Sequence, residues 1–321
     1  MAAIWTPTSS ASRPATSLFA WDYGIASDQH MDKKYIVITG CSSGFGRITA
    51  LSLASRNWHV FATVRKEADR ESLLAEATER GCQDNLSIIF CDITQHEQVR
   101  ALAQQVEAQL GERMQIEGTP PLHALVNNAG TAFGAPIELI ELDDLRSQFE
   151  INVIAHIDVT QALLPLLKAG RGTIINVSSV SGRISMPIVG AYSASKFALE
   201  ALSDALRIEL APFGVRVVVI EPESSPTNIW QTSANQAAPH LNQHRNGPYS
   251  RLLTYSENMV KTSSQHGFPA QLFADTVSKI LESRRPRAYY SIPFKASLVI
   301  ALHRFAPNKL WDFALRCLLR W

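Results

Sequence analysis

From residue 34 onward, short runs of β-branched residues alternate with longer segments whose apolar residues recur at helical spacing. The short runs predict strands over 35–39, 59–64, 86–91, 122–126, 172–177, 215–220 and 287–292. The longer segments predict helices over 44–56, 67–80, 95–110, 141–168, 190–211 and 269–284. Strands separated by such helices form right-handed βαβ units, so the pattern predicts an α/β fold: a doubly wound, Rossmann-type parallel sheet with helices on both faces.

Three parts of the chain do not follow this alternation. Residues 111–121 contain Gly and Pro and are typical of a surface insertion. Residues 223–268 are polar without a clear period, and we expect such a long irregular segment after a strand end to be a functional lid. Residues 1–32 are rich in Ala, Ser, Thr and Pro, which predicts a disordered leader. The expected α/β domain therefore covers 33–292, followed by an extension over 293–321.

The extension over 293–321 is apolar and basic, and it predicts two short amphipathic helices separated near Pro307. In one interpretation these helices cover an end of the domain core or form an oligomer interface. In the other they border the mouth of a site for a lipophilic substrate, or they contact a membrane peripherally. The basic residues that would then face anionic headgroups are Arg304, Lys309, Arg316 and Arg320.

The composition excludes several classes of protein. Lys and Arg number 30 against 29 Asp and Glu, so no strongly basic nucleic-acid-binding surface is expected. The 4 cysteines lack CxxC or metal-ligand spacing, which argues against a disulfide framework and a metal site. No uninterrupted apolar run reaches the roughly 18 residues of a spanning helix. We expect a cytoplasmic protein, with a membrane-peripheral position as the alternative.

The first strand runs into a glycine-rich turn, Thr39–Gly46, and then into a helix. Glycine allows backbone to approach a pyrophosphate closely, and the helix N-terminus offers that anion free N–H groups. A purely structural turn is the alternative, but the position between strand and helix favours a nucleotide site. The candidate binding residues are Gly40, Ser42, Ser43, Gly44, Phe45 and Gly46.

The end of the second strand indicates which dinucleotide is bound. A site for NAD usually has an acid here that binds the adenosine ribose. In this chain Val64 is followed by Arg65 and Lys66. A guanidinium pairs well with a 2′-phosphate, although a solvated surface arginine would look the same. Arg65 therefore favours NADP(H), with NAD(H) as the alternative cofactor.

Tyr192 and Lys196 lie four residues apart, on one face of a predicted helix. A free tyrosine has a pKa near about 10, and we expect the neighbouring ammonium to lower it. Alone, this spacing is common on helix surfaces. Ser179 lies thirteen residues upstream beyond a strand, Asn152 lies in the preceding helix, and 127–130 follow another strand. Strand ends of this kind are where open α/β sheets bind ligands.

In this order the motifs resemble the short-chain dehydrogenase/reductase family: TGxxxGxG at 39–46, NNAG at 127–130, Asn152, Ser179 and YxxxK at 192–196. The resemblance covers about residues 33–222 and is greatest to the 17β-hydroxysteroid and retinol dehydrogenase branch. It implies an NAD(P)-binding catalytic domain that interconverts a lipophilic alcohol and its ketone or aldehyde. It also implies a homodimer or homotetramer.

The resemblance implies a role for each matching residue. Tyr192 would be the general acid/base, and Ser179 would hold the carbonyl oxygen. Lys196 would bind the nicotinamide ribose, and Asn152 would support a proton-relaying water. The remaining implied cofactor contacts are Asp92 and Ile93 near the adenine, Asn127, Ala129 and Gly130 on the adenosine side, and Pro222, Ser225 and Thr227 beside the nicotinamide.

The segment Pro222–Thr227 departs from the family pattern, because Glu223 stands where the family has glycine. An outward Glu223 would change nothing, whereas an inward one would weaken cofactor binding. The alternative function is therefore a dinucleotide-binding regulatory or scaffold protein with reduced turnover. A nucleotide-sugar epimerase or dehydratase is disfavoured by the TGxxxGxG spacing and the small C-terminal region.

Overall fold

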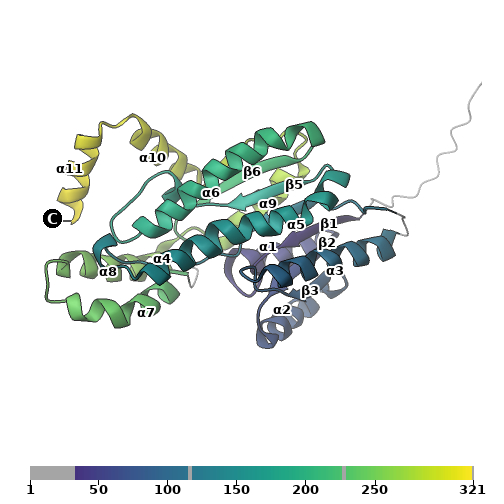
Figure 1. The fold of residues 1–321 in the computed structure, drawn as a ribbon, viewed down its shortest axis with the longest axis horizontal. Helices are drawn as coiled ribbons and strands as arrows, with labels where there is room; N and C mark the ends of the chain where they lie inside the picture. Colours follow the sequence, from purple (N-terminus) through teal and green to yellow (C-terminus); the bar gives the residue numbers. More distant parts are fainter. Residues whose placement is uncertain (1–32, 115–117, 226–228, 320–321) are drawn as a thin grey trace, which may run out of the picture. The chain divides into compact units, whose positions relative to one another are not determined.

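The computed structural model describes residues 33–114, 118–225 and 229–319 (Figure 1), so the predicted leader over 1–32 lies outside the described residues. One parallel sheet has the strand order β3-β2-β1-β4-β5-β6-β7. Its strands are β1 Lys34–Ile38, β2 Trp58–Val64, β3 Leu86–Phe90, β4 Ala124–Asn127, β5 Thr173–Val177, β6 Arg216–Pro222 and β7 Tyr289–Ile292. This arrangement confirms the predicted Rossmann-type sheet.

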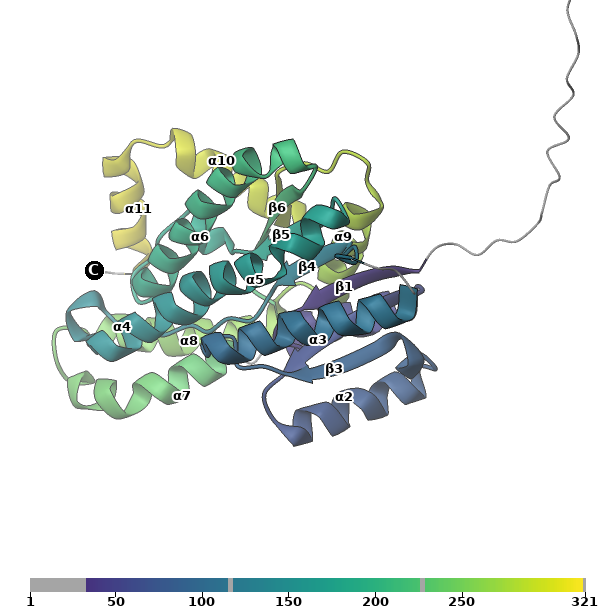
Figure 2. The ribbon, with the colours of Figure 1, turned by 45° about the vertical axis from the view of Figure 1, so that its right-hand side comes forward.

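Helices cover both faces of the sheet (Figures 1 and 2). Side chains of three helices pack in one buried cluster with the sheet: α1 Gly44–Ala54, α2 Glu67–Glu79 and α9 Ala270–Glu282. Side chains of two others pack in the second cluster: α3 His96–Met114 and α5 Ala155–Ala169. Helix α6, Gly190–Glu209, follows β5.

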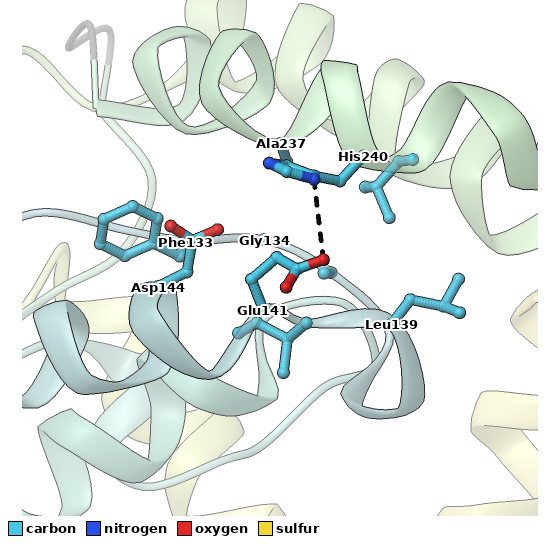
Figure 3. A pocket seen from close by; sticks show the side chains of 10 residues that line it. Phe133, Gly134, Leu139, Glu141, Asp144, Ala237 and His240 are labelled. Atoms are coloured by element: carbon cyan, nitrogen blue, oxygen red, sulfur yellow. Dashed lines mark ion pairs between the residues drawn. The ribbon is translucent and has the colours of Figure 1, made fainter.

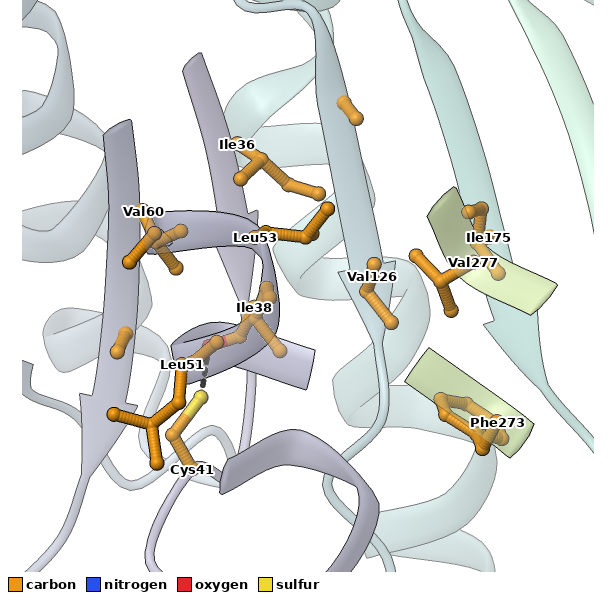
Figure 4. Close-up of a cluster of buried hydrophobic side chains, with 14 of the residues drawn as sticks. Ile36, Ile38, Cys41, Leu51, Leu53, Val60, Val126, Ile175, Phe273 and Val277 are labelled. Carbon is orange, nitrogen blue, oxygen red and sulfur yellow. Dashed lines mark hydrogen bonds between the residues drawn. The ribbon is translucent and has the colours of Figure 1, made fainter. Parts of the chain in front are cut away.

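The two buried clusters divide the residues of β1 between them. Ile36 and Ile38 face the cluster shown in Figure 4, whereas Tyr35 and Val37 face the other. A strand buried on both faces needs apolar residues at every position, which explains the continuous run in the sequence. Strand order reverses between β1 and β4, and their carboxyl ends border the crevice in which such sheets bind ligands.

The helix predicted over 141–168 is interrupted. Helix α4, Leu142–Phe149, gives way to a π-helical turn over Glu150–Ile154 before α5 begins. Such π turns insert a residue into the helical repeat and often occur at functional sites. Asn152 lies within this turn and is buried.

The prediction of irregular structure between 223 and 268 was wrong. This segment contains α7, Ile229–Leu241, and α8, Ser250–His266. Leu252 and Leu253 of α8 pack on Ile188, and this burial stabilises helices whose polar composition hid them. The expected insertion over 111–121 is also shorter, because α3 continues to Met114.

After β7 come α10, Phe294–Phe305, and α11, Asn308–Leu319, the two helices predicted on either side of Pro307. Helix α11 contacts α8 through buried Leu319, which joins Ile188 and Leu252 in one apolar cluster. Among the described residues, no helix is long and apolar enough to cross a membrane.

Candidate active site

The glycine-rich turn after β1 is joined to the segment after β4. Thr39 Oγ1 accepts hydrogen bonds from Asn128 N at 2.9 Å and Ala129 N at 3.0 Å. The Asn128 side-chain amide donates to Thr39 O at 2.8 Å and to Gly40 O at 3.1 Å. The two segments therefore form one rigid unit. Asn128 is a residue that the sequence reasoning missed, although it lies within the NNAG motif.

Two glycines of this turn have no room for a side chain. A Cβ on Gly46 would lie 2.3 Å from Gly40 O and 2.5 Å from the Asn128 amide nitrogen. Gly40 has φ +70°, and a Cβ there would lie 2.8 Å from Ala129 Cα. Backbone packed this closely at the start of α1 is a cradle suited to a pyrophosphate. Ser42, Ser43 and Gly44 complete the turn, whereas the Phe45 ring stacks on Phe273 in the core with centroids 4.4 Å apart.

The predicted adenosine-side residues differ in where their side chains lie. Arg65 is exposed just beyond β2, next to Thr63, whose hydroxyl accepts from Gly40 N at 3.0 Å. Asp92 caps the following turn by accepting from Thr94 N and Oγ1, and Ile93 is buried. Asn127 turns into the core, where its amide donates to Thr160 and Asn176, both at 2.9 Å. Asn127 is fully buried, so its side chain supports the end of β4 from within.

Asn152 is bonded to the loop that follows Gly130. Its amide oxygen accepts from Thr131 N at 3.0 Å, and its nitrogen donates to Thr131 O at 3.0 Å and to Ser195 Oγ at 3.1 Å. A Cβ on Gly130 would lie 3.3 Å from Asn152 Oδ1 and 3.9 Å from Lys196 Nζ. The π turn thus brings Asn152 and α6 to the end of β4.

Two buried polar residues that the sequence reasoning missed hold the same loop. His156 shares a 2.6 Å hydrogen bond with Ala129 O, and burial, followed by the charge of Lys196, lowers its pKa to about 3. Gln148 accepts from Phe133 N and donates to Thr131 O, both at 2.8 Å. Each lies one helical turn from Asn152, the spacing that could have indicated a shared face.

Tyr192, Lys196 and Ser179 meet where β5 ends and α6 begins. The Lys196 ammonium donates to Val177 O at 2.8 Å and lies 5.8 Å from the Tyr192 ring centroid. Burial lowers the pKa of Lys196 to about 8, while the charge of Glu200 raises it. Ser179 Oγ accepts from Ser181 N at 3.1 Å and donates to Pro222 O at 3.4 Å. The neighbouring Ser178 bonds instead to Glu200.

The expected lowering of the Tyr192 pKa was wrong for this arrangement. Burial raises the pKa of Tyr192 to about 12, and the nearby Ser179 hydroxyl offsets only part of that rise. The phenol is 7% exposed, and the Lys196 ammonium is directed at a backbone carbonyl rather than at the phenol oxygen. A protonated Tyr192 is suited to donate a proton.

The segment after β6 turns Glu223 outward. Its carboxylate lies 3.7 Å from Lys295 Nζ at the surface, while its backbone N–H donates to Ile292 O at 2.7 Å. Ser225 is buried and donates to Phe268 O at 2.8 Å, which fixes the segment beyond Pro222. Thr227 lies outside the described residues.

Apolar side chains surround Tyr192 on its remaining side. Trp230 of α7 meets the phenol ring edge-on, with centroids 5.4 Å apart at 72°. Other members of this apolar wall are Ala132, Met186, Val189, Ile229 and Met259. Next to it, Ile188 has φ +74°, a conformation that a β-branched residue adopts only when packing enforces it.

Helices α7 and α8, which occupy the segment expected to be a lid, also contact the loop before α4. A cavity of about 10 Å³, room for a single water, lies between them and is lined by residues that include Phe133, Asp144 and Ala237 (Figure 3). His240 Nδ1 lies 3.6 Å from Glu141 Oε1 across it. Tyr249 donates a hydrogen bond to Glu138. These polar contacts lie at the surface and add to the apolar packing of α7 and α8.

Comparison with known proteins shows to which family the chain belongs. A family model described as short chain dehydrogenase matches residues 34–238. The chain is 31% identical to an NADPH-dependent 3-dehydrocapnine reductase of Ornithobacterium rhinotracheale, over 87% of this chain and 95% of that protein. It is 33% identical to human 17-beta-hydroxysteroid dehydrogenase type 6, over 89% of each. A solved short-chain dehydrogenase from Streptomyces avermitilis superposes with TM-score 0.69 and 28% identity, over 84% of this chain and 92% of that chain.

Proposed function

Because this chain belongs to the short-chain dehydrogenase/reductase family of oxidoreductases, we propose that it interconverts a lipophilic alcohol and its ketone or aldehyde with NADP(H). One observation carries the proposal. A buried, protonated Tyr192 lies near Ser179 and Lys196 and faces an apolar wall. This combination is suited to general acid catalysis on the carbonyl of a lipophilic substrate.

In the reducing direction the Tyr192 hydroxyl gives its proton to the substrate's carbonyl oxygen while the Ser179 hydroxyl donates a hydrogen bond to that oxygen. The nicotinamide, when bound, supplies the hydride. Lys196 holds the nicotinamide ribose and stabilises the phenolate that Tyr192 becomes. In the oxidising direction Tyr192 takes the proton back from the alcohol. Asn152 keeps the Thr131 backbone and α6 in register.

The cofactor proposal rests on the glycine cradle and Arg65. The close approach of Gly40 and Gly46 to neighbouring backbone suits a pyrophosphate, and exposed Arg65 suits a 2′-phosphate. Arg47, the other arginine near the turn, is paired with Glu76 at 2.7 Å. The relative from Ornithobacterium rhinotracheale is named as NADPH-dependent, which supports the same choice.

The test is to follow NADPH oxidation with a panel of steroid, retinoid, fatty and small aromatic carbonyls. Tyr192→Phe should lower kcat by about 10³-fold, within the range for general acid–base catalysis. NADPH affinity and thermal stability serve as controls and should stay near wild type. If NADPH binds but is oxidised with none of these carbonyls, the alternative of a regulatory or scaffold protein replaces this proposal.

For Arg65→Asp we expect the ratio of kcat/KM with NADPH to kcat/KM with NADH to fall at least tenfold, since an aspartate would repel the 2′-phosphate.

We further propose that α10 and α11 dock on an anionic lipid surface, from which a lipophilic substrate would reach the lid. Phe294, Leu298, Leu302 and Phe305 form one stripe of α10 and are 72%, 62%, 66% and 82% exposed. Ala296, on the opposite side of this helix, is the buried one.

Helix α11 continues the same pattern. Leu310 and Phe313 are 60% and 65% exposed on one side of the helix. On the other side, Leu319 packs in the apolar cluster with Ile188 and Leu252. Exposed Lys309 and Arg316 flank the apolar face of α11, and this combination favours anionic headgroups over a neutral surface.

Sedimentation with phosphatidylcholine vesicles, with and without phosphatidylserine, tests this docking. The wild type should bind the anionic vesicles, and the double variant Leu302→Glu, Phe305→Glu should bind at least tenfold more weakly. Ile208→Glu, at an equally exposed residue of α6 that is 67% exposed, is the control and should bind normally. Equal binding of all variants would show that another surface of the protein binds the vesicles. A double variant that is a monomer where the wild type is a dimer would show that a second copy of the chain, rather than lipid, covers α10 and α11.

We also propose self-association through the outer faces of α5 and α6. The exposed apolar side chains of Ile154, just before α5, and Leu202 of α6 line a groove of about 510 Å³. Light scattering after size exclusion should give a dimer or tetramer for wild type and a smaller species for Leu202→Glu.

A further inference from the structure

Helix α6 carries a third buried ionisable residue in line with Tyr192 and Lys196. Glu200 follows Lys196 by four residues, so the three side chains lie on one helix face. Tyr192, Lys196 and Glu200 are 7%, 4% and 4% exposed. A carboxylate this deeply buried is costly unless it is paired, so its partners indicate why it is there.

The Glu200 carboxylate contacts the turn that carries the catalytic serine. Oε1 accepts a hydrogen bond from Ser178 Oγ at 2.7 Å. Oε2 lies 2.6 Å from Arg183 Nε. Between these two residues, a Cβ on Gly182 would lie 2.3 Å from Glu200 Oε1, so the turn packs directly on the carboxylate. Ser179 therefore lies on a turn whose position Glu200 determines.

Arg183 extends the contact to the last two strands. Its Nε lies 2.7 Å from Glu221 Oε1, and Ser291 Oγ donates to the other oxygen of Glu221 at 2.7 Å. The guanidinium also lies over the Tyr289 ring, 4.2 Å from its centroid. Two buried carboxylates thus share a single guanidinium. The next positive charge is the Lys196 ammonium, one helical turn from Glu200.

We propose that Glu200 is a positioning residue of the active site: its carboxylate holds the Ser178–Ser179 turn against α6 and supplies the negative charge that keeps Lys196 protonated. Arg183 and Glu221 in turn hold Glu200 and connect it to the strand that ends at Pro222. The proposal rests on the proposed function for the roles of Ser179 and Lys196.

The charges around Glu200 set the pH range in which it acts. Burial raises the pKa of Glu200 to about 8, the Ser178 hydrogen bond and Arg183 lower it, and Glu221 and Asp204 raise it. Tyr289, which donates to Asp204, completes the titratable groups facing this site. Glu200 therefore becomes negative in the pH range in which Lys196 titrates, since burial lowers and the charge of Glu200 raises the pKa of Lys196, which is about 8. Its charge then extends the alkaline range of the active enzyme.

Two substitutions separate the charge of Glu200 from its shape. Glu200→Gln keeps the acceptor for Ser178 but removes the charge, whereas Glu200→Asp keeps the charge on a shorter side chain. In ketone reduction with NADPH, the alkaline limb of kcat/KM should move to lower pH by about one unit in Glu200→Gln, because removal of an anion lowers the pKa of Lys196. In Glu200→Asp kcat should fall several-fold while the limb stays in place.

Glu209→Gln is the matched control, since it removes a carboxylate from the exposed end of the same helix, about 20 Å along the axis from Lys196. Its pH profile should equal that of wild type. NADPH affinity from pH 7 to 10, measured by tryptophan fluorescence, gives a readout without turnover. As pH rises, the affinity of Glu200→Gln for NADPH should begin to decline at a lower pH than that of the wild type. If neither the pH profile of kcat/KM nor that of NADPH affinity shifts in Glu200→Gln, the proposed role of Glu200 is wrong. If no carbonyl is reduced but the pH profile of NADPH affinity shifts, only the proposed function is wrong.

Discussion

The turn after β1 and the lid after β6 both border the candidate active site, but different forces hold them. Directional hydrogen bonds at 2.8–3.1 Å fix the turn, and Gly46 leaves no space for a methyl group. The lid rests mainly on apolar contacts of Leu252, Leu253 and Ile188. Apolar contacts are non-directional and tolerate exchange. The molecule thus combines a rigid side suited to one cofactor with an adaptable side suited to a variable substrate.

The sharpest way to break this comparison is a methyl group on the rigid side. Gly46→Ala should weaken NADPH binding by about 100-fold, because overpacking at a site without room costs up to about 3 kcal/mol. The measurement is titration calorimetry with NADPH. Gly111→Ala is the control: a Cβ there meets no atom within 4 Å, and alanine favours the helix that contains it. A Gly46→Ala protein that binds NADPH normally would show that the turn adapts.

These two regions also differ in how far the sequence could predict them. Thr39–Gly46 was identified because glycine and a helix start impose the local geometry themselves. The helices α7 and α8 were missed because the packing that stabilises them comes from Ile188, far away in the chain. The same holds for Glu200 and Arg183, whose contact exists only in the folded protein.

Even within correctly predicted helices, the sequence pattern does not predict features that depend on tertiary contacts. The π turn at Glu150–Ile154 has no periodic signature, so the sequence predicted one continuous helix. The pKa of Tyr192 moves in the direction opposite to that expected from Lys196, because Trp230 and its neighbours bury the phenol. Burial of a single side chain depends on the whole fold.

A second prediction concerns the pH dependence of the rigid side. His156 has a folded pKa of about 3, below its unfolded value of about 6.5, so the unfolded state binds more protons between these values. The free energy of unfolding should therefore fall as pH drops below 6.5, with about 2 kcal/mol lost by pH 5 through His156. Urea unfolding should show a flatter pH dependence for His156→Gln, which retains a donor for Ala129 O. An equal slope in both proteins would assign the acid sensitivity to other groups.

The smallest expected effect lies in the lid. Trp230→Ala removes the ring that meets Tyr192 edge-on. We expect KM for large lipophilic carbonyls to rise about tenfold, since loss of one apolar pocket contact is worth about 1–3 kcal/mol. For small aromatic carbonyls KM should change little, and NADPH affinity should stay at its wild-type value because the phosphate turn does not contact the lid residue. If the substitution weakened NADPH binding as much as substrate binding, the two sides would be mechanically coupled, and the division into a rigid and an adaptable side would not hold.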